Sequence, residues 1–540
     1  MKRLAVALTL LLALVAAPLA AMAEQGPPGE ISGRLARILE RGRLIVGVKA
    51  DYPPWGMRDA SGALTGIEPE LAADLARRLG VGLELAAVSA ANRLQLLEQG
   101  SVDVVIATMG DTEERRRMAD LIQPPYNSSG VGLFVQPGFP FTDWGQLRGR
   151  TLCLTAGAYY NRPLQERYLV GGLTFPSNAT ALQALIDGRC VGWAFDTTLA
   201  RSLLAQDTGG LTEAALPQIL TVHWVMAVAR GEGEAPLGRF IGDAVADWHR
   251  TGFLIARRAA FDLPETAFLT RMNRLWQDTD ATGHPLCARS AEGHWPARCL
   301  AGEGLRTSGE PIALPPWARR IEAASGFSLA ALFDPFAQAA LLRGMLVTAG
   351  LSATAIVGSL LVGVTLGLAD RAAAGLWLLR APVRLAMTVA RMTPPILQLY
   401  IVFFGVGSLM ASRWGVTPGA FAVAGTILAA YAGASDAVLV SAALEIEQAR
   451  RPGTALPALL PAALLRAFDG LVAVSVNIAK AAGMASAIAL SEIIATVNGL
   501  VAQGASPATL MNLLLLFYFL FVMALVGLFR AARRLLGVAR

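Results

Sequence analysis

Lysine is almost absent from this chain of 540 residues, whose three lysines are Lys2, Lys49 and Lys480. A phosphate-binding loop needs a lysine between glycine and serine or threonine, and none of the three has those neighbours. The chain therefore does not hydrolyse ATP through a loop of this type. Its net charge of +6 comes from arginines that are scattered instead of forming one stripe, which argues against nucleic-acid binding.

Histidine and cysteine are also scarce, with four residues of each type. His284 and His294 flank Cys287 without the spacing of a zinc site, so we expect no metal and no other cofactor. The few histidines and the lack of a nucleophile motif also argue against an enzyme.

Charged residues make up only 16% of the chain, hydrophobic residues 54%, and the mean hydropathy is +0.49. Part of the chain must therefore face lipid. Residues 1–23 carry Lys2 and Arg3, then an apolar run, then Ala-Met-Ala at 21–23. This pattern predicts a signal peptide cleaved before Glu24, and an uncleaved anchor is the alternative.

Residues 24–270 have the pattern of an α/β domain. The predicted strands are residues 44–48, 102–107, 151–154 and 191–195, with a helix over residues 69–79. The loop at residues 50–55 follows the first strand, at the edge where open α/β sheets bind ligands.

The cysteines predict disulfides, because an exported domain enters an oxidising compartment. Cys153 and Cys190 each lie at a predicted strand, and we expect them to pair. Cys287 and Cys299 lie in a loop-rich stretch and are the candidates for a second bridge.

A corner between a strand and a helix, at residues 108–115, gathers groups that suit a small carboxylate. Thr112 can cap a new helix, whose free backbone amides favour anions. Arg115 offers a planar fork of donors that fits a carboxylate. The alternative is that Arg115 belongs to a solvated run of three arginines.

Several segments in one order resemble the polar amino-acid-binding proteins, which are the solute-binding proteins (family 3 type) of ABC importers. The resemblance covers about residues 43–262. The segments are 42–48 (GRLIVGV), 51–55 (DYPPW), 62–66 (GALTG), 68–72 (EPELA), 96–103 (LLEQGSVD), 112–115 (TEER), 125–126 (PY) and 188–190 (GRC) followed by Asp196.

The resemblance implies a two-lobed clamshell of the periplasmic binding protein type II, hinged by crossing strands and closing on one amino acid. Arg115 would hold the α-carboxylate, beside Thr108 and the Gly110 backbone. Asp196, from the other lobe, would accept the α-ammonium group. A zwitterion that leaves water needs both charges met, which agrees with this arrangement. A surface aspartate that caps a helix is the alternative for Asp196.

Tyr52 and Trp55 would form the wall of the side-chain pocket, with core packing as the alternative. Gly157 would supply part of the carboxylate site. It departs from the family pattern, because Ala158 follows where hydroxyl residues are common. Lys49 lies where the family recognises the ligand's side chain, and it favours an acidic or amide ligand unless it is solvated.

The remainder divides into a linker or small disulfide-stapled extension at residues 271–335 and a transmembrane domain at residues 336–540. We expect the transmembrane domain to be all-α. Its five candidate spans are residues 344–368, 393–411, 417–440, 460–497 and 510–529. An exported amino terminus then places the carboxyl terminus inside. The arginines agree, since Arg371, Arg380, Arg384 and Arg391 fall in one predicted cytoplasmic loop and Arg530, Arg533, Arg534 and Arg540 in the tail.

The membrane half resembles the permease subunit of a polar amino-acid ABC importer of the histidine/glutamine type, through residues 391–399 (RMTPPILQL), 430–431 (AY) and 460–480. The resemblance implies a cytoplasmic coupling helix that seats in a groove of the ATPase. The matching residues are Glu447, Gln448, Ala449 and Gly453. Pro452 interrupts this helix and the segment is short, so either the ATPase has adapted or coupling is weakened or lost. A solvated charge is the alternative for Glu447.

Four ionisable residues in the predicted spans are candidates for lining the path or for pairing with each other, or else they lie at the membrane interface. They are Asp436, Asp469, Lys480 and Glu492. We expect Lys480 to pair with Asp469 or Glu492.

The two resemblances together indicate the fused receptor and translocator of an amino-acid importer in the inner membrane, with the binding domain in the periplasm. A separate cytoplasmic subunit would hydrolyse ATP, and the chain would form a homodimer or pair with a related permease. The alternatives are an amino-acid-sensing membrane receptor and a clamshell-derived enzyme acting on small carboxylic acids. The sequence does not identify the amino acid.

Overall fold

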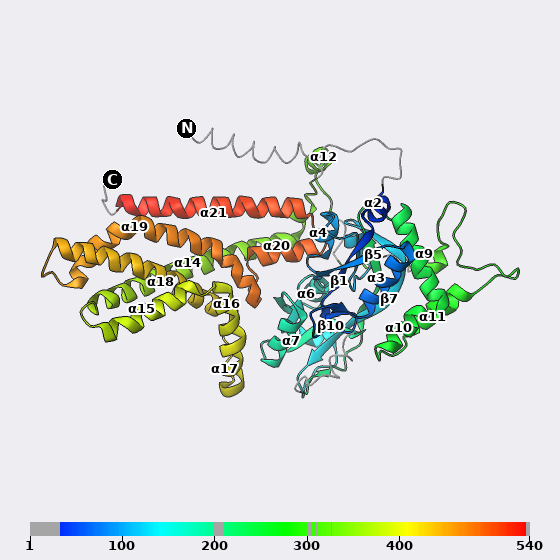
Figure 1. Cartoon of the computed structure of the whole chain (residues 1–540), viewed down its shortest axis with the longest axis horizontal. Helices are drawn as coiled ribbons and strands as arrows, with labels where there is room; N and C mark the ends of the chain where they lie inside the picture. The colour runs from blue at the N-terminus through cyan, green and yellow to red at the C-terminus, as the bar shows by residue number, and fades with distance from the viewer. Residues whose placement is uncertain are drawn as a thin grey trace.

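The computed structural model of the chain describes residues 33–198, 210–300, 302, 304–307, 312–325 and 327–535. Figure 1 shows an α/β part at one end of the molecule and a bundle of long helices at the other. This confirms the predicted fold class, a two-lobed α/β domain followed by an all-α domain. The predicted signal peptide at residues 1–23 lies outside the described residues.

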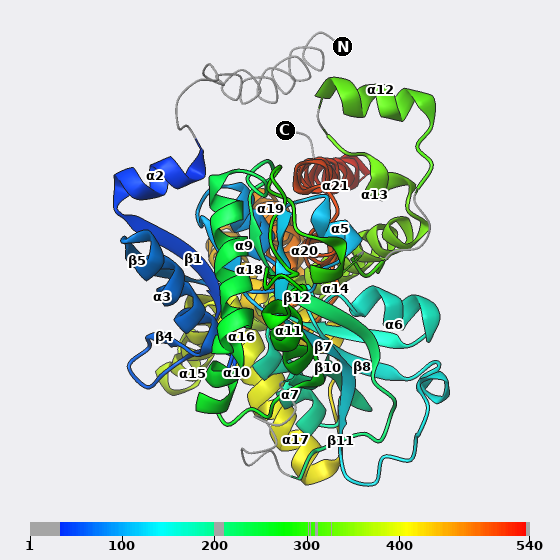
Figure 2. The ribbon, with the colours of Figure 1, turned by 90° about the vertical axis from the view of Figure 1, so that its right-hand side faces the viewer.

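One sheet runs through both lobes in the order β5-β1-β6-β12-β7-β10-β8-β9, and β11 pairs with β7. Parallel strands at each end of this order belong to one lobe each, and two long strands lie between them (Figure 2). The strands are β1 (Arg43–Lys49), β5 (Gly82–Val88) and β6 (Val104–Ile106) in the first lobe, β8 (Thr151–Thr155), β9 (Gly171–Phe175) and β10 (Gly192–Asp196) in the second, and β7 (Asp120–Val135), β11 (Thr212–Glu213) and β12 (Ile219–Val228) between them.

The two long strands form the hinge that the resemblance implied. β7 pairs antiparallel with β12, and Ala227 of β12 pairs with Val105 of β6 in the first lobe. The far end of β7 pairs with β10 of the second lobe, with Leu133 opposite Ala194. In the described residues the sheet passes from lobe to lobe only through β7 and β12, which is the position of a hinge in the clamshell that the resemblance implies.

Helices flank the sheet, and a small antiparallel sheet extends the first lobe. The helix predicted from residue 69 begins two residues earlier, at Ile67, and ends as expected at Gly80, which has a φ of +69°. These elements are α2 (Arg34–Arg41), α3 (Ile67–Leu79), α4 (Arg93–Glu98), α5 (Glu113–Arg116), η1 (Trp144–Leu147), α6 (Asn161–Arg167), α7 (Asn178–Ile186), α9 (Pro236–Thr251), α10 (Phe253–Ala260) and α11 (Ala267–Gln277), with β2 (Asp51–Tyr52), β3 (Gly56–Arg58) and β4 (Leu64–Thr65).

Both predicted disulfides are present. Cys153 of β8 is bonded to Cys190, directly before β10, and Cys287 is bonded to Cys299 in the loop after α11. The second bridge includes the turn η2 (Ala297–Cys299), and α12 (Pro316–Ser325) and α13 (Ala330–Phe333) then lead to the long helices. The first bridge ties two neighbouring strands of the second lobe together.

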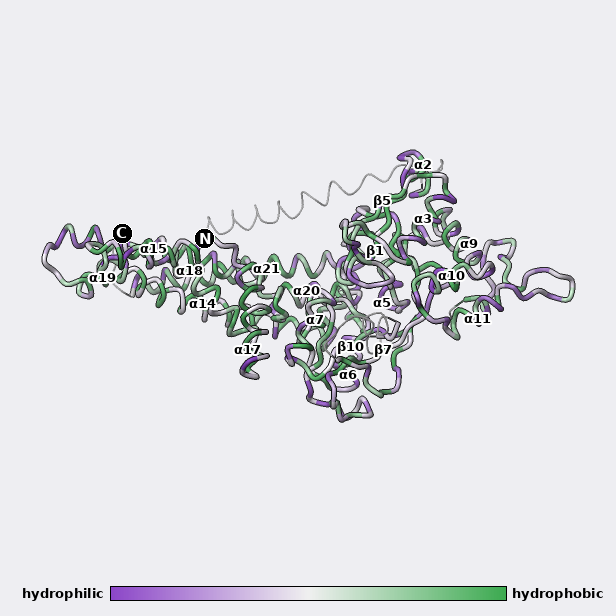
Figure 3. Tube along the Cα trace, turned by 60° about the horizontal axis from the view of Figure 1, so that its bottom comes forward, coloured by the Kyte–Doolittle hydropathy of each residue, from purple (hydrophilic) through white to green (hydrophobic). Residues whose placement is uncertain are grey.

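In the part of the chain that the structure describes, five helices are long and apolar enough to cross a membrane, as expected, and α21 is coloured mostly as hydrophobic or neutral in Figure 3. The candidate span at residues 460–497 is not one continuous helix, because α19 ends at Ala481, next to Lys480. The five segments are Pro335–Ala372, Pro395–Trp414, Ala420–Arg450, Leu456–Ile488 and Pro507–Arg534. Their elements are α14 (Pro335–Ala372), α16 (Pro395–Tyr400), η3 (Ile401–Val406), α17 (Gly407–Trp414), α18 (Ala420–Arg450), α19 (Leu456–Ala481), η4 (Ala482–Ile488) and α21 (Pro507–Leu535), with the short α20 (Ile493–Ala502) before α21.

Small residues hold α14 and α18 close together. A Cβ atom added at Gly363 of α14 would lie 2.4 Å from the Cβ of Asp436, and one at Gly433 of α18 would lie 2.6 Å from Val362. Helices in a membrane associate largely through such close approach of their backbones. These two helices therefore form the centre of the bundle.

The arginine-rich stretch between the first two candidate spans contains a helix. Residues Trp377–Met392 form the helix α15, which packs against α18 and runs beside the bundle in Figure 1. Arg380 and Arg384 both bind Asp370, at 2.9 Å each. The stretch lies between two candidate spans, as predicted, and two of its arginines pair with the end of α14.

The predicted short coupling helix is also absent from the described residues. Glu447, Gln448 and Ala449 lie in the last turn of α18, and Gly453, with a φ of +84°, lies in the five-residue turn before α19. Glu447 is buried and its Oε1 lies 2.6 Å from Nη2 of Arg466, so it is not a solvated charge. The turn is too short to hold a separate helix.

The expected partners of Lys480 are occupied elsewhere. Asp469 lies 3.1 Å from Arg533 of α21. Glu492 caps α20, accepting hydrogen bonds from the backbone N–H groups of Ile494 (2.8 Å) and Ala495 (2.7 Å). Free backbone N–H groups at the start of a helix are stabilised by a side-chain acceptor, and Glu492 has this role in α20. The predicted pairing of Lys480 with Asp469 or Glu492 is therefore wrong.

Each lobe contacts a different part of the helical domain. In the second lobe, Arg189 donates to the carbonyls of Phe403 (2.8 Å) and Pro418 (3.0 Å), and Asp187 accepts from Ser408 (2.8 Å). The same lobe binds the start of α14 through two hydrogen bonds from Arg162 to Asp334. The first lobe contacts the segment at residues 304–307, which leads towards the helices.

Candidate functional site

The corner after β6 presents Arg115 to the cleft between the lobes. Thr112 caps α5, as predicted, by accepting from the Arg115 N–H (3.3 Å). The buried guanidinium donates to the Gly110 carbonyl (2.9 Å) in its own lobe and to the Gly157 carbonyl (3.1 Å) in the other. Burial lowers the pKa of Arg115 to about 9. Arg115 is thus not part of a solvated run.

The first of the helix amides expected beside Arg115 is already engaged. The Glu113 N–H donates to the Leu305 carbonyl (3.2 Å), and the Leu305 N–H donates to the Asp111 carbonyl (3.0 Å). A segment from outside the α/β sheet therefore pairs with this corner and occupies its first amide. The guanidinium of Arg115, which lines the cavity, is still accessible to an anionic ligand at this corner.

Asp196, the last residue of β10 in the second lobe, lines the same cavity as Arg115. Its Oδ2 accepts from the Tyr52 hydroxyl (2.7 Å), which reaches across from the first lobe, and the Tyr159 hydroxyl lies 3.5 Å from Oδ1. Burial raises the pKa of Asp196 to about 6. The carboxylate is therefore a poorly solvated anion that a cationic group would stabilise.

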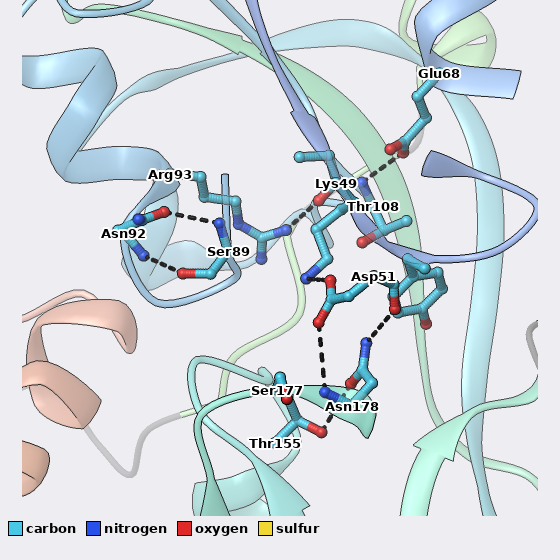
Figure 4. A network of polar contacts seen from close by, with 12 residues as sticks. Lys49, Asp51, Glu68, Ser89, Asn92, Arg93, Thr108, Thr155, Ser177 and Asn178 are labelled. Atoms are coloured by element: carbon cyan, nitrogen blue, oxygen red, sulfur yellow. Dashed lines mark hydrogen bonds and ion pairs between the residues drawn. The ribbon is translucent and has the colours of Figure 1, made fainter. Parts of the chain in front are cut away.

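A second polar group lies along the same cleft, shown in Figure 4. The Lys49 ammonium is 3.0 Å from Oδ1 of Asp51, and the Asn178 side chain donates to the Asp51 carbonyl (3.1 Å) from the other lobe. Arg93, the first residue of α4, is 2% exposed and donates to the Ala107 carbonyl. Arg93 and Lys49 point into the same space.

These side chains enclose one cavity between the lobes. It is lined by residues at the carboxyl ends of the parallel strands, the edge at which open α/β sheets bind ligands. The lining residues are Lys49, Tyr52, Ala90, Arg93, Thr108, Arg115, Thr155, Ala158, Tyr159, Tyr160, Asn178 and Asp196.

Among the residues selected from the sequence, Tyr52, Thr108, Arg115 and Asp196 line this cavity. Gly110 and Gly157 contribute carbonyls to Arg115 rather than amide donors. Trp55 was expected at the wall but lies behind it. Its ring packs edge-on against Trp224, with the ring centroids 4.8 Å apart, which fits the core-packing alternative.

Sequence reasoning missed Arg93, Asn178 and the two tyrosines at residues 159 and 160. Arg93 follows β5 and Asn178 follows β9, so both lie at the carboxyl edge of the sheet. Correct strand predictions for these two segments would have identified them. In the described residues, no group of three or more histidine, cysteine or acidic side chains is placed to hold a metal ion.

None of the four histidines, all of them in described parts of the chain, lines the cavity. His249 is buried beneath the site, 2.8 Å from the Pro125 carbonyl, and burial lowers its pKa to about 4.

Residues 44–284 match the family of bacterial extracellular solute-binding proteins, family 3. The L-cystine-binding protein of Escherichia coli (strain K12) is 30% identical over 229 residues, covering 42% of this chain and 84% of that protein. The cyclohexadienyl dehydratase of Pseudomonas aeruginosa is 30% identical over 197 residues, covering 35% and 69%. The solved structure of a solute receptor for L-cysteine of Neisseria gonorrhoeae is 30% identical and covers 42% of this chain and 92% of its own, with a TM-score of 0.40.

Proposed function

The chain belongs, through residues 44–284, to the bacterial extracellular solute-binding proteins, family 3, and on that premise we propose that it captures a free amino acid and passes it to its own membrane helices. The main support for this proposal is a pair of opposite charges in the cavity. The guanidinium of Arg115 and the carboxylate of Asp196 line one cavity from opposite lobes.

The α-carboxylate of the ligand binds Arg115, and its α-ammonium group binds Asp196. Each of these side chains is buried and forms no ion pair with any residue in the described parts of the chain. A buried charge without a counter-charge is unfavourable, so a zwitterion that neutralises both is stabilised on entry. The L-cystine-binding protein to which this chain is similar supports a ligand of this class.

Closure of the lobes completes the site. Tyr52 meets Asp196 and Arg115 meets Gly157 only when the lobes are together, because each contact joins residues of different lobes. In the closed arrangement Arg189 and Asp187 of the second lobe bind the helical domain. Closure around a ligand thus fixes the surface that meets the translocator.

The helical domain acts as the permease of an ABC importer in the inner membrane, with the binding domain in the periplasm. Five apolar helices support a membrane domain. The energy comes from ATP bound by a separate cytoplasmic subunit, since the chain lacks its own phosphate-binding loop. Two copies of the chain, or one copy and a related permease, form the complete pathway.

A second function, an amino-acid-sensing membrane receptor, is favoured by one observation. The turn between α18 and α19 is five residues long, and Glu447 binds Arg466 instead of facing outward. Such a turn presents only a small surface to which an ATPase could bind. The enzyme alternative has weaker support, since a dehydratase relative exists but no histidine lines the cavity.

The experiment uses the full chain purified from its native membrane in mild detergent, so that bound subunits are retained. Calorimetric titration with a panel of amino acids tests the receptor, and no binding across the panel would refute it. Ligand-stimulated ATP hydrolysis by the same preparation supports the importer. Ligand binding without any associated ATP hydrolysis supports the sensing receptor instead.

A further inference from the structure

Arg93 is a buried cation that the binding of a simple amino acid does not use. Its guanidinium lines the cavity, yet Arg93 forms no ion pair with any described residue. One Nη donates to the Ala107 carbonyl, and the buried Nε has no hydrogen-bond partner in the described parts of the chain. Donors therefore remain free on a side chain that is only 2% exposed.

The acidic groups near Arg93 are committed to other partners. Asp51 binds Lys49 (3.0 Å) and lies 3.4 Å from the Asn178 N–H. Glu68 lies behind Thr108, where one oxygen accepts from the Thr108 N–H (2.5 Å) and the Tyr126 hydroxyl (2.6 Å). Burial also raises the pKa of Glu68 to about 7, so at neutral pH it is only partly ionised. Neither carboxyl group forms an ion pair with Arg93 in the described residues.

The charges that line the cavity are consequently unequal. Arg93, Arg115 and Lys49 are cationic, whereas Asp196 is the one acidic residue of the lining. When Arg115 and Asp196 have bound the α-carboxylate and α-ammonium groups, Arg93 is still without a counter-charge. A guanidinium binds a carboxylate through two parallel hydrogen bonds, and Lys49 points into the same space (Figure 4).

We propose that the ligand carries a second carboxylate, which Arg93 binds, and that basic amino acids are excluded. This inference rests on the proposed function, since it assigns the α-groups to Arg115 and Asp196. The like charge of Arg93 and Lys49 repels a basic side chain. A neutral amide can accept from Arg93 but leaves its charge buried and unpaired.

Two kinds of ligand have this chemistry. An acidic amino acid, such as L-glutamate or L-aspartate, has its second carboxylate on the side chain. L-Cystine has it in a second zwitterionic half, whose ammonium group needs an additional acceptor. Both place a carboxylate at Arg93, and direct competition between them identifies which source the site takes.

The test is calorimetric titration of the full chain in detergent with L-glutamate, L-aspartate, L-cystine, L-glutamine and L-arginine. We expect at least one dicarboxylate to bind roughly 10- to 100-fold more tightly than L-glutamine, as for a lost charge-assisted hydrogen bond, and L-arginine not to bind. Arg93→Gln should remove this preference, so that the dicarboxylates bind no more tightly than L-glutamine does to the same variant. The exposed Arg148, changed to Gln, is the matched control.

Two results would overturn the inference while leaving the proposed function standing. One is L-glutamine or L-arginine binding to the unmodified chain as tightly as every dicarboxylate. The other is an equal loss for all ligands in Arg93→Gln, which would assign Arg93 to the α-carboxylate. If the variant does not fold, the ranking on the unmodified chain decides. Failure of all five ligands to bind would instead refute the proposed function itself.

Discussion

Thr307 binds Glu114, the residue directly before Arg115. Its N–H lies 3.1 Å from Oε1 of Glu114 and its hydroxyl donates to Oε2 (2.8 Å). A Cβ atom added at Gly504, in the turn between α20 and α21, would lie 2.7 Å from the Cβ of Glu114. The short helix that carries the proposed carboxylate ligand is therefore held between the segment that leads to the membrane helices and one of their turns.

Arg115→Ala should abolish amino-acid binding, with a loss of at least about 100-fold, because the α-carboxylate loses its charged partner. Calorimetric titration of the full chain measures the loss. Arg117→Ala, from the same run of arginines but exposed, is the control and should bind normally. Near-normal affinity in Arg115→Ala, with the control intact, would refute the site.

Affinity should fall as pH drops below about 6. Burial raises the pKa of Asp196 to about 6 from an ordinary value of 3.8, so acid protonates this carboxylate and the α-ammonium group loses its partner. Each further pH unit should weaken binding roughly tenfold. Asp196→Asn should bind weakly at every pH, without this dependence.

The same pKa shift has the opposite sign for folding. A raised carboxyl pKa stabilises the ligand-free protein most below its ordinary value, and this contribution is lost as pH rises through about 6. Weaker binding at pH 5 is thus not caused by unfolding at Asp196, and a thermal melt at pH 5 checks this. Glu68→Gln removes the titration of Glu68, so that the remaining pH dependence can be assigned to Asp196. The amide oxygen of glutamine can accept the same two hydrogen bonds.

Arg189→Ala should leave ligand binding unchanged but lower transport several-fold or more. The side chain is remote from the cavity and binds the Phe403 and Pro418 carbonyls of the helical domain. Titration and uptake by proteoliposomes measure the two effects separately. Normal uptake in this variant, matched against Arg148→Ala, would show that the contact does not couple the lobes to the helices.

Reversing the Glu447–Arg466 pair tests the end of α18 and α19. Glu447→Arg alone brings like charges together at a buried position and should lower the melting temperature. Adding Arg466→Glu should restore most of it. Ligand affinity should stay constant in both variants, and ATP-coupled uptake should fall even in the restored pair if Glu447 contacts an ATPase.

Removing the Cys153–Cys190 bridge should destabilise the second lobe by roughly 4 kcal/mol, from the loop-closure entropy of 37 residues. The bridge at Cys287 and Cys299 closes 12 residues, and its loss should cost about 3 kcal/mol. Paired Cys→Ala variants followed by tryptophan fluorescence in urea measure both. Equal or smaller loss for the first bridge would contradict this ranking.

Local pattern predicted the core of the binding domain well. The apolar run at residues 44–48 located β1, and Gly80 located the end of α3. The strand β5 was not predicted, because its sequence GLELAAV is rich in residues that favour helices. Arg93, which follows it, was missed for that reason, although the strand makes a full parallel pairing with β1.

Burial of individual polar groups could not be predicted, because it depends on segments far apart in the chain. Whether Arg115 is solvated depends on Gly157, and whether Glu447 is exposed depends on Arg466. The pairing of residues 304–307 with the Arg115 corner joins elements almost 200 residues apart. Periodicity within one segment carries no information about such contacts.

The scarcity of lysine makes Lys49 a natural chemical probe of the cleft. It is the one lysine between residues 3 and 479, it is 2% exposed, and its ammonium group is held against Asp51. Acylating reagents attack only a deprotonated, accessible amine. Their rate of attack at this position should therefore follow the fraction of molecules in which the lobes have separated, and a bound ligand should slow it in proportion to its occupancy.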